Sequence, residues 1–397
     1  PAQNGPIGSN GICVIDGASA TIRGNQISQN WYFDSVASAG VLLYGAGDVL
    51  LANNMLTNNQ QGIAIVGAAR SDASIVIENS SIEGGVAGIA IEGPSTYYKS
   101  DYAPAVLVRG NSILSDPIID NASTAMCMAN FNYYGLPEDV AGNLATLFPG
   151  AGPVDHDLWV GDVASLAQIR SGAAPSNLWT DGTTAEKLQA GLNAVADGGF
   201  LHVTEGTYTQ ALSIVDKSMT IIAEDEVKLQ KTGTGTILSV STGTNPDLDV
   251  VTILGHGNLT IDGQNSARDV LINSGVKVRI EGTRITNGFT TGTTVGAGIY
   301  VSGGILELVN SLVDNNEDGT GGGISLLGGQ ATIINSTITK NTGTLGGGIF
   351  VGGGDLNLYN SIVAGNVATS LLYLYPNDTP PSNLLVDGGP DVMLFQS

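Results

Sequence analysis

Short runs of alternating hydrophobic residues, separated by Gly and Asn, return every 25 residues between positions 298 and 366. The three copies open at Gly298, Gly323 and Gly348, and each copy contains three such runs. Alternation over a few residues predicts β-strands, and Gly and Asn between the runs are typical of turns. Three strands and three turns per copy predict one coil of a parallel β-helix, which must stack on further coils to bury its apolar side chains.

Asn and Ser stand at the same turn positions in every copy. Residues one period apart lie above one another in a stack of coils, so these side chains are expected to form columns along the axis. Stacked amides can hydrogen bond from coil to coil, and we interpret the columns as structural turn residues. The predicted columns consist of Asn310, Asn335, Asn360, Ser311, Ser336, Ser361, Asn316, Asn341 and Asn366.

Residues 11–116 repeat the pattern less regularly, with a polar turn column at Asn25, Asn54, Ser80 and Asn111. Both halves of the chain therefore predict the same fold class. This class is all-β, a right-handed parallel β-helix, present as two stacks in series.

Several positions that should face outward in the first half are apolar. They are Leu42, Leu50, Val76 and Leu107. A solvated sheet face should be polar, so we expect residues 117–160 or another molecule to cover them. The alternative is that they are scattered exposed apolar residues, which are common on protein surfaces.

Residues 183–197 fit an amphipathic helix, in which Thr183 and Glu186 form a capping box. The apolar stripe of this helix consists of Leu188, Leu192 and Val195. A helix at this point would cap the second stack and shield its open strand edge. It is the one interior capping helix that the sequence predicts.

Three stretches carry a resemblance to a known family. ANFNYYGLPEDV at 129–140 and GPVDHDLWV at 152–160 resemble the closing motifs of bacterial right-handed β-helix proteins, and AVADGGFLHVTEGTYTQ at 194–210 resembles their opening. Tyr134 stands where that family has Trp, and Leu158 stands where it has Pro. The resemblance implies a pectin-lyase-like fold. It also points to repeat-rich bacterial surface proteins, such as polymorphic membrane protein-like and haemagglutinin-like adhesins.

These motifs suggest an organisation into two domains. Residues 1–161 form the C-terminal part of a first β-helix, with a closing segment at 117–161. Residues 162–182 are interpreted as a linker. Residues 183–397 form the second β-helix, which opens with the capping helix and ends without a closing motif.

Charge excludes some classes of partner. The chain has 14 Lys and Arg against 36 Asp and Glu, a net charge of −22. Such an acidic chain is a poor ligand for nucleic acid or an anionic membrane. No apolar run is long enough for a membrane-spanning helix. We expect an extracellular or cell-surface protein.

The same fold supports pectate lyases and polygalacturonases, so we searched for their chemistry. His256 lies in a GHG motif like that of polygalacturonases, but the paired carboxylates that inverting hydrolysis needs do not accompany it. The outward positions of the first strand of each coil offer neither a carboxylate nor a base. They are Cys13, Leu42, Ala64, Ala90, Tyr300, Ser325 and Phe350. We therefore predict no catalytic residue and no cofactor.

Two candidate binding sites remain. Asp314, Glu317 and Asp318 could hold Ca²⁺, although their spacing is not that of an EF-hand and we favour a solvated acidic turn. Two inserted loops carry aromatic residues that could contact a carbohydrate or a partner, or pack on their own domain. These residues are Trp31, Tyr32, Phe33, Tyr97, Tyr98 and Tyr102.

The sequence thus predicts a non-enzymatic structural or adhesive module of a secreted bacterial surface protein. One form of this hypothesis is a subunit that assembles end to end into an extracellular filament. Its partners would be copies of itself, in head-to-tail or lateral contact, further β-helix repeats of a longer parent, or surface glycans. The alternative is a β-helix that binds or degrades polysaccharide.

Overall fold

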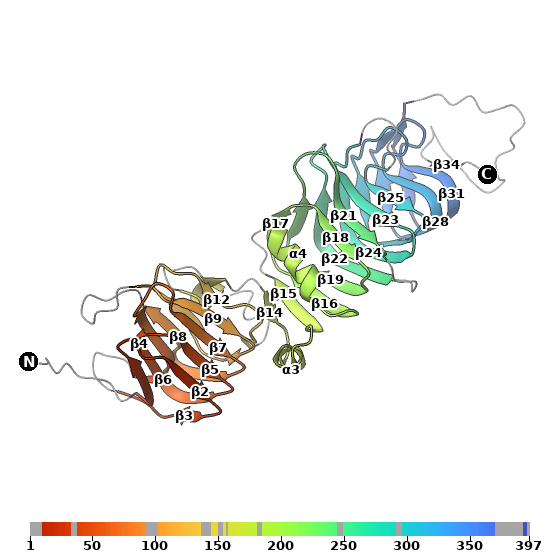
Figure 1. Cartoon of the computed structure of the whole chain (residues 1–397). Coiled ribbons are helices and arrows are strands. Elements are labelled where there is room, and N and C mark those ends of the chain that lie inside the picture. Colours follow the sequence, from red (N-terminus) through yellow and green to blue (C-terminus); the bar gives the residue numbers. More distant parts are fainter. Residues whose placement is uncertain are drawn as a thin grey trace, which may run out of the picture. The chain divides into compact units, whose positions relative to one another are not determined.

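The computed structural model describes residues 10–32, 38–92, 102–135, 144–149, 154–155, 158–180, 185–243, 249–290, 296–369 and 392–394. The chain divides into two compact units, Pro1–Trp179 and Thr180–Ser397 (Figure 1). Each unit is described by itself below, as unit 1 and unit 2. None of the helices in the described ranges has the length and apolar character needed to span a bilayer.

Unit 1 is a stack of coils whose strands pair in parallel with their counterparts one coil further on. One wall contains β1 (Ile12–Ile15), β3 (Gln26–Ser28), β4 (Ala39–Ala46), β6 (Met55–Ala68), β8 (Ser81–Glu92), β10 (Ser112–Ile113) and β11 (Ile119–Asn121). A second wall contains β2 (Ala20–Arg23), β5 (Val49–Ala52), β7 (Ser74–Glu78), β9 (Ala105–Arg109), β12 (Cys127–Met128) and β13 (Val154–Asp155). Helices α2 (Leu144–Leu147) and α3 (Val163–Ser171) and strands β14 (Leu158–Val160) and β15 (Asn177–Thr180) follow.

Unit 2 continues the same architecture in more regular coils. Its first strands are β16 (Gly199–Val203), β17 (Gly206–Thr209), β18 (Leu212–Val215), β19 (Met219–Ala223), β20 (Val227–Gln230), β21 (Thr236–Ser241), β22 (Asp249–Asp262), β23 (Arg268–Asn273) and β24 (Val276–Thr286). The later strands are β25 (Ile299–Ser302), β26 (Ile305–Val309), β27 (Leu312–Asp314), β28 (Ile324–Ile334), β29 (Thr337–Thr339), β30 (Thr342–Gly343), β31 (Ile349–Tyr359), β32 (Ile362–Ala364), β33 (Val367–Ala368) and β34 (Val392–Leu394).

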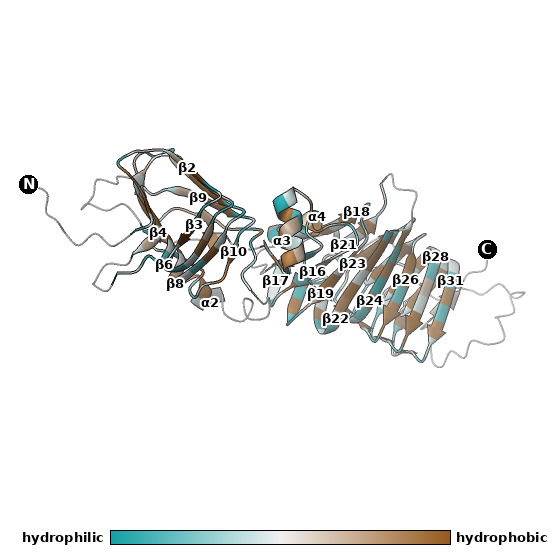
Figure 2. Ribbon diagram, turned by 90° about the horizontal axis from the view of Figure 1, so that it is seen from below, coloured by the Kyte–Doolittle hydropathy of each residue, from teal (hydrophilic) through white to brown (hydrophobic). Residues whose placement is uncertain are grey.

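The period of the sequence sets the register of unit 2. Ile299 pairs with Ile324, and Ile324 pairs with Ile349, each 25 residues apart. All three side chains are fully buried, so the inward positions of successive coils stack into one core. Brown and teal bands alternate along the strands in Figure 2, as expected when one side of each strand faces the core. The prediction of a right-handed parallel β-helix is confirmed.

Helix α4 (Ala185–Ala194) caps the first coil of unit 2, as the sequence predicted. Leu188 and Leu192 are buried against that coil, where they line a small apolar cavity of about 20 Å³ with Leu212 and its neighbours. The amide of Gln189 satisfies the open edge of β18, because it accepts from the N–H of Ser213 (2.8 Å) and donates to the Ser213 carbonyl (2.9 Å). The proposed capping box, Thr183 and Glu186, lies outside the residues whose side chains are described.

Residues 162–182, interpreted from sequence as a linker, contain α3 and β15, and the division between the two units falls within them. Asp162 caps α3 by accepting from the N–H of Ser165 (2.6 Å). Arg170 anchors the helix to unit 1, since its guanidinium donates to the carbonyls of Gly110 (2.9 Å) and Ser80 (3.2 Å). The helix is short, and its apolar residues are too few to produce a clear periodic pattern.

Several positions predicted to face solvent are covered instead. Ser325 is fully buried and Phe350 is 7% exposed, although both point away from the core of the coil. The turn that precedes each strand folds back over it, and glycine permits this close approach. A Cβ on Gly321 would lie 2.2 Å from the Ser325 hydroxyl and 2.7 Å from the Phe350 Cβ. Ala64 and Ala90 in unit 1 are also buried, at 8% exposed each.

Candidate functional site

A ladder of buried asparagines runs through one turn of unit 2. The side-chain oxygen of Asn341 accepts from both the backbone N–H (3.0 Å) and the side-chain amide (2.9 Å) of Asn316. Asn366 accepts in the same way from Asn341, at 3.0 and 2.9 Å. The amide of Asn341 also donates to the carbonyl of Val313 (2.9 Å), so each rung ties together neighbouring coils. Asn341 is fully buried, and its hydrogen bonds satisfy backbone groups that water cannot reach.

A second ladder is built from serine. The N–H of Ser311 donates to the Ser336 hydroxyl (3.1 Å), and the N–H of Ser336 donates to the Ser361 hydroxyl (3.2 Å). Each hydroxyl in turn donates to a carbonyl two residues earlier in its own coil, as Ser336 does to Ile334 (2.9 Å). These columns therefore hydrogen bond along the axis through side chains, in addition to the backbone pairing of the strands.

The third column, Asn310, Asn335 and Asn360, has another role. These residues are exposed, and their backbone φ angles of 49°, 50° and 50° are left-handed. Asn tolerates this conformation better than most residues, so the column supplies the turn backbone. The sequence pattern could not separate this column from the ladder at Asn316.

Unit 1 contains an equivalent ladder. Asn25 donates to Asn54, the N–H of Asn54 donates to Ser80, and the N–H of Ser80 donates to the side-chain oxygen of Asn111 at 2.8 Å. Asn132, which the sequence analysis missed, continues the column by accepting from the N–H of Asn111 (2.9 Å). It lies in the stretch that resembles a closing motif, where the regular period is lost.

An ionic cluster covers two walls of unit 2 at outward strand positions. Arg279 on β24 contacts Glu307 on β26 and Glu281 (2.6 Å), and Lys277 also reaches Glu307 (3.3 Å). Arg284 pairs with Asp314 through two hydrogen bonds of 3.0 and 2.8 Å. Sequence inspection missed these pairs because their partners are 28 and 30 residues apart and meet only when the coils are placed in register.

Two aspartates near this cluster have opposite electrostatic environments. Burial opposes the charge of Asp262, but hydrogen bonds from Lys228, Asn287 and the N–H of Gln264 outweigh it and lower the pKa of Asp262. Burial raises the pKa of Asp269 well above its ordinary value, and the nearby carboxylates of Asp262 and Asp314 raise it further. Asp269 is fully buried, and neither of its carboxyl oxygens has a hydrogen-bond partner among the described residues. The nearby N–H of Gly263 is bonded to the Thr286 carbonyl instead (2.9 Å).

Asn substitutions at these two aspartates should therefore change stability in opposite directions. The pKa of Asp269 is raised in the folded protein, so the buried carboxyl costs least when it is neutral. Its contribution to stability is fully present below the unfolded pKa near 4 and is lost as the pH rises through the folded pKa. Asp269→Asn should stabilise unit 2 at neutral pH and have little effect in acid.

The pKa of Asp262 is lowered in the folded protein, so its ionised carboxylate stabilises the fold above the unfolded pKa, and this stabilisation is lost as the pH falls. Asp262→Asn should destabilise unit 2 at neutral pH.

Urea titrations followed by circular dichroism, at pH values from about 3 to about 8, would measure both effects. Equal shifts of the same sign for the two variants would contradict this assignment of the two carboxyl groups.

The acidic turn suggested as a Ca²⁺ site uses its carboxylates within the protein. Asp314 is paired with Arg284, and Asp318 accepts from the N–H groups of Gly296 (2.5 Å), Gly319 (2.6 Å) and Gly321 (3.1 Å). These donors occupy the oxygen atoms that a cation would need, while the Glu317 side chain is exposed. Within the described ranges, no group of three His, Cys, Asp or Glu residues could hold a metal ion.

The aromatic candidates are separated in the structure. Trp31 and Tyr102 are exposed, at 40% and 42%, and Tyr32 is partly exposed next to Trp31. Tyr102 lies at another part of unit 1, where its carbonyl accepts from the N–H of Ala68 (2.7 Å). Phe33, Tyr97 and Tyr98 lie outside the described residues.

His256 is an exposed turn residue with a left-handed φ of 50°. It precedes Gly257 in the bend of β22. In the next coil, Gly282 lies in the corresponding bend of β24. The side chain of Asp262, further along β22, is engaged by Lys228 (2.7 Å).

The apolar outward residues of unit 1 fall on two different walls. Leu50, Val76 and Leu107 stack in one row, which Met128 on β12 extends. Leu107 and Met128 are 40% and 50% exposed, so the described part of residues 117–160 lengthens this row and leaves it open. Leu42 belongs to the other wall, where it stacks between Cys13 and Ala64.

Comparison with known proteins agrees with this architecture. Residues 3–126 match the family model described as a right handed beta helix region. A search of curated proteins found no match to this chain. The family match over residues 3–126 and the parallel coils of both units agree on the fold, a right-handed parallel β-helix.

Proposed function

We propose that the chain is a non-enzymatic structural and adhesive module of a secreted bacterial surface protein. The observation that carries this proposal is the set of buried and partly buried Asn and Ser ladders, such as Asn316–Asn341–Asn366, which link turn to turn along the stack. Strand pairing alone already joins neighbouring coils. The ladders add hydrogen bonds at the turns, which in most proteins are the mobile parts. The result is a stiff stack suited to holding a surface in a fixed shape.

The adhesive part of the proposal rests on the walls of the stack. Solenoids present extended surfaces that repeat at the coil spacing of about 4.8 Å, and these surfaces commonly serve for binding. Unit 1 exposes Trp31, Tyr102 and the Leu107–Met128 row, and aromatic and apolar side chains of this kind are enriched at binding interfaces.

A polysaccharide-active protein is the second candidate, and one observation favours it. Lys228, Lys277, Arg279 and Arg284 gather on outward positions of unit 2, in a chain with only 14 basic residues. An anionic polysaccharide would be attracted to such a cluster. Each of these cations is already paired with a carboxylate, which reduces its attraction for a ligand.

One experiment separates the two candidates. The full chain is applied to a glycan array and is also incubated with polygalacturonate, alginate and neutral glucans, while released reducing ends and unsaturated uronates are measured. We expect binding without release, because Asp262, the carboxylate that follows His256 on β22, is already engaged by Lys228 (2.7 Å). Turnover that disappears with His256→Ala or Asp262→Ala would contradict the structural proposal and establish the second candidate.

The domain boundaries, the extracellular location and self-association of the chain stay predictions.

A further inference from the structure

We propose that Trp31 is the stacking platform of a binding site for a neutral glycan, on the outer face formed by β3, β6 and β8 of unit 1. This inference gives the proposed adhesive module its ligand class, and therefore rests on that proposed function. It is carried by the way the indole is held and by the outward side chains of β3, β6 and β8.

The backbone on both sides of Trp31 is fixed by side chains of the next coil. Asn30 donates its N–H (3.2 Å) and its side-chain amide (2.7 Å) to Asn59, as a rung of an asparagine ladder. The N–H of Tyr32 donates to the side-chain oxygen of Gln60 (3.1 Å). A ligand that meets Trp31 therefore meets a residue whose position is already set, which lowers the entropic cost of binding.

The indole itself is anchored along one edge. Its Nε1–H donates to the carbonyl of Asn58 (2.8 Å), and Cζ2 and Cη2 of the six-membered ring approach Gly85 one coil further on. A Cβ at Gly85 would lie 2.6 Å from Cη2 and 3.0 Å from Cζ2 of the ring, so glycine is required beneath it. Trp31 is nevertheless 40% exposed, so part of the anchored ring is left for other contacts.

This exposure distinguishes Trp31 from the other two tryptophans. Trp159 and Trp179 stack on each other with centroids 6.1 Å apart and are 1% and 4% exposed. They serve the packing of unit 1. A tryptophan that is held rigidly but left exposed makes no comparable contribution to the core, so its orientation needs another explanation.

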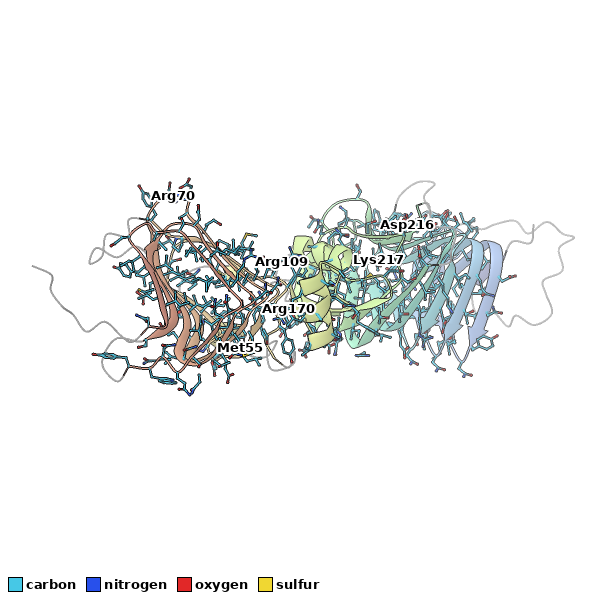
Figure 3. The ribbon with its side chains drawn as sticks, turned by 60° about the horizontal axis from the view of Figure 1, so that its bottom comes forward. Met55, Arg70, Arg109, Arg170, Asp216 and Lys217 are labelled. Carbon is cyan, nitrogen blue, oxygen red and sulfur yellow. The ribbon has the colours of Figure 1, made fainter. Side chains whose placement is uncertain are left out.

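The neighbouring outward positions have the chemistry of sugar recognition. On β3 and β6, Ile27 and Leu56 point into the core, which leaves Gln26, Ser28, Met55 and Thr57 on the outer face. Met55 is 47% exposed and lies at the rim of unit 1 opposite Arg70 in Figure 3. Hydroxyl and amide groups can exchange hydrogen bonds with sugar hydroxyls, while the indole and the thioether contact the apolar C–H face of a pyranose ring.

The charge of this face selects among glycans. The corresponding outward residues of β8 are Ser81 and Glu83, so the six positions carry one carboxylate and no cation. A uronate or other acidic sugar would be repelled here, and a neutral sugar would not. A protein partner would gain more from a broad apolar patch than from this mixture of hydroxyls and amides.

The test uses the full chain and the fluorescence of Trp31. Because the other two tryptophans are buried, acrylamide quenching at accessible sites reports mainly on Trp31. The probes are hexasaccharides of β-linked glucose, mannose, xylose and N-acetylglucosamine, with oligogalacturonate as the acidic comparison. We expect at least one neutral probe to bind and to protect the fluorescence from quenching, while oligogalacturonate gives no protection.

Three variants sharpen the result. Trp31→Ala should weaken binding of the neutral probe about ten-fold or more, as expected for loss of an aromatic contact. Gly85→Ala should also weaken it, by displacing the ring without removing it. Tyr359→Ala removes an exposed aromatic side chain (55%) from β31 of unit 2 and should leave the affinity unchanged.

Protection by none of the neutral probes, or equal affinity in the wild type and Trp31→Ala, would overturn the inference. Capture of a protein by this face without glycan binding would overturn it as well. If Trp31→Ala fails to fold, Gly85→Ala provides the same comparison. Enzymatic turnover would count against the proposed function and not against the Trp31 site, so the two failures are distinguishable.

Discussion

Ile338→Asp is expected to destabilise unit 2 by more than about 3 kcal/mol, because it places an unpaired charge in a stacked apolar core. Ile338 is fully buried at the centre of β29, and its register neighbours on either side are Val313 and Val363. Because β29 is paired with a strand on each side and Ile338 is inaccessible to water, the new carboxylate would be poorly solvated.

The chain supplies an internal control for this measurement. All three tryptophans lie in unit 1, so tryptophan fluorescence follows unit 1 while circular dichroism follows both units. Ile338→Asp should shift the dichroism transition in urea and leave the fluorescence transition in place. Thr337→Asp, one residue earlier and partly exposed, should cost less than about 1 kcal/mol. A larger cost for Thr337→Asp than for Ile338→Asp would show that the strand is one residue out of register, and equal costs would contradict the burial of Ile338.

Asn341→Ala is expected to have the second largest effect, a loss of roughly 3 kcal/mol. The substitution removes the acceptor of the Asn316 N–H and one donor to the Val313 carbonyl, and it leaves the Asn316 N–H buried without its side-chain acceptor. Buried polar groups that lose a partner pay a desolvation penalty that water cannot relieve.

The matched control is Asn335→Gly, six residues earlier in the same coil. Asn335 is exposed and has a left-handed φ of 50°, which glycine adopts at no steric cost. This variant should change the free energy of unfolding by less than about 1 kcal/mol. The same loss at both positions would mean that the ladder contributes no more than an ordinary turn residue.

The sequence predicted the register of the stack because a fixed period places equivalent residues above one another. The inward positions at Ile299, Ile324 and Ile349 follow directly from it. The period could not show that Ser325 is covered, since that depends on how the glycine turn at Gly321 folds back over the strand.

The contacts at the candidate surfaces could not be predicted from the sequence, because they form between residues of different coils. Arg279 meets Glu307 only after one coil is placed on the next, and no local pattern marks the pair. Asp269 follows a turn whose length differs from the regular repeat, so its burial could not be inferred from alternation. The sequence marks Trp31 as one of six aromatic candidates, but its anchoring by Asn58 and Gly85 depends on two further coils.

Hydrogen exchange of the turn amides tests most directly whether the ladders stiffen the stack. The N–H groups of Asn316 and Asn341 in unit 2, and of Asn111 in unit 1, donate to side chains of the next coil. If the ladders hold the turns as rigidly as the strands, these amides should exchange as slowly as that of Ile324, which is bonded to the Gly348 carbonyl within the sheet (2.9 Å). Exchange at the rate of an unstructured peptide would contradict the account, because the turns would then open independently of the strands.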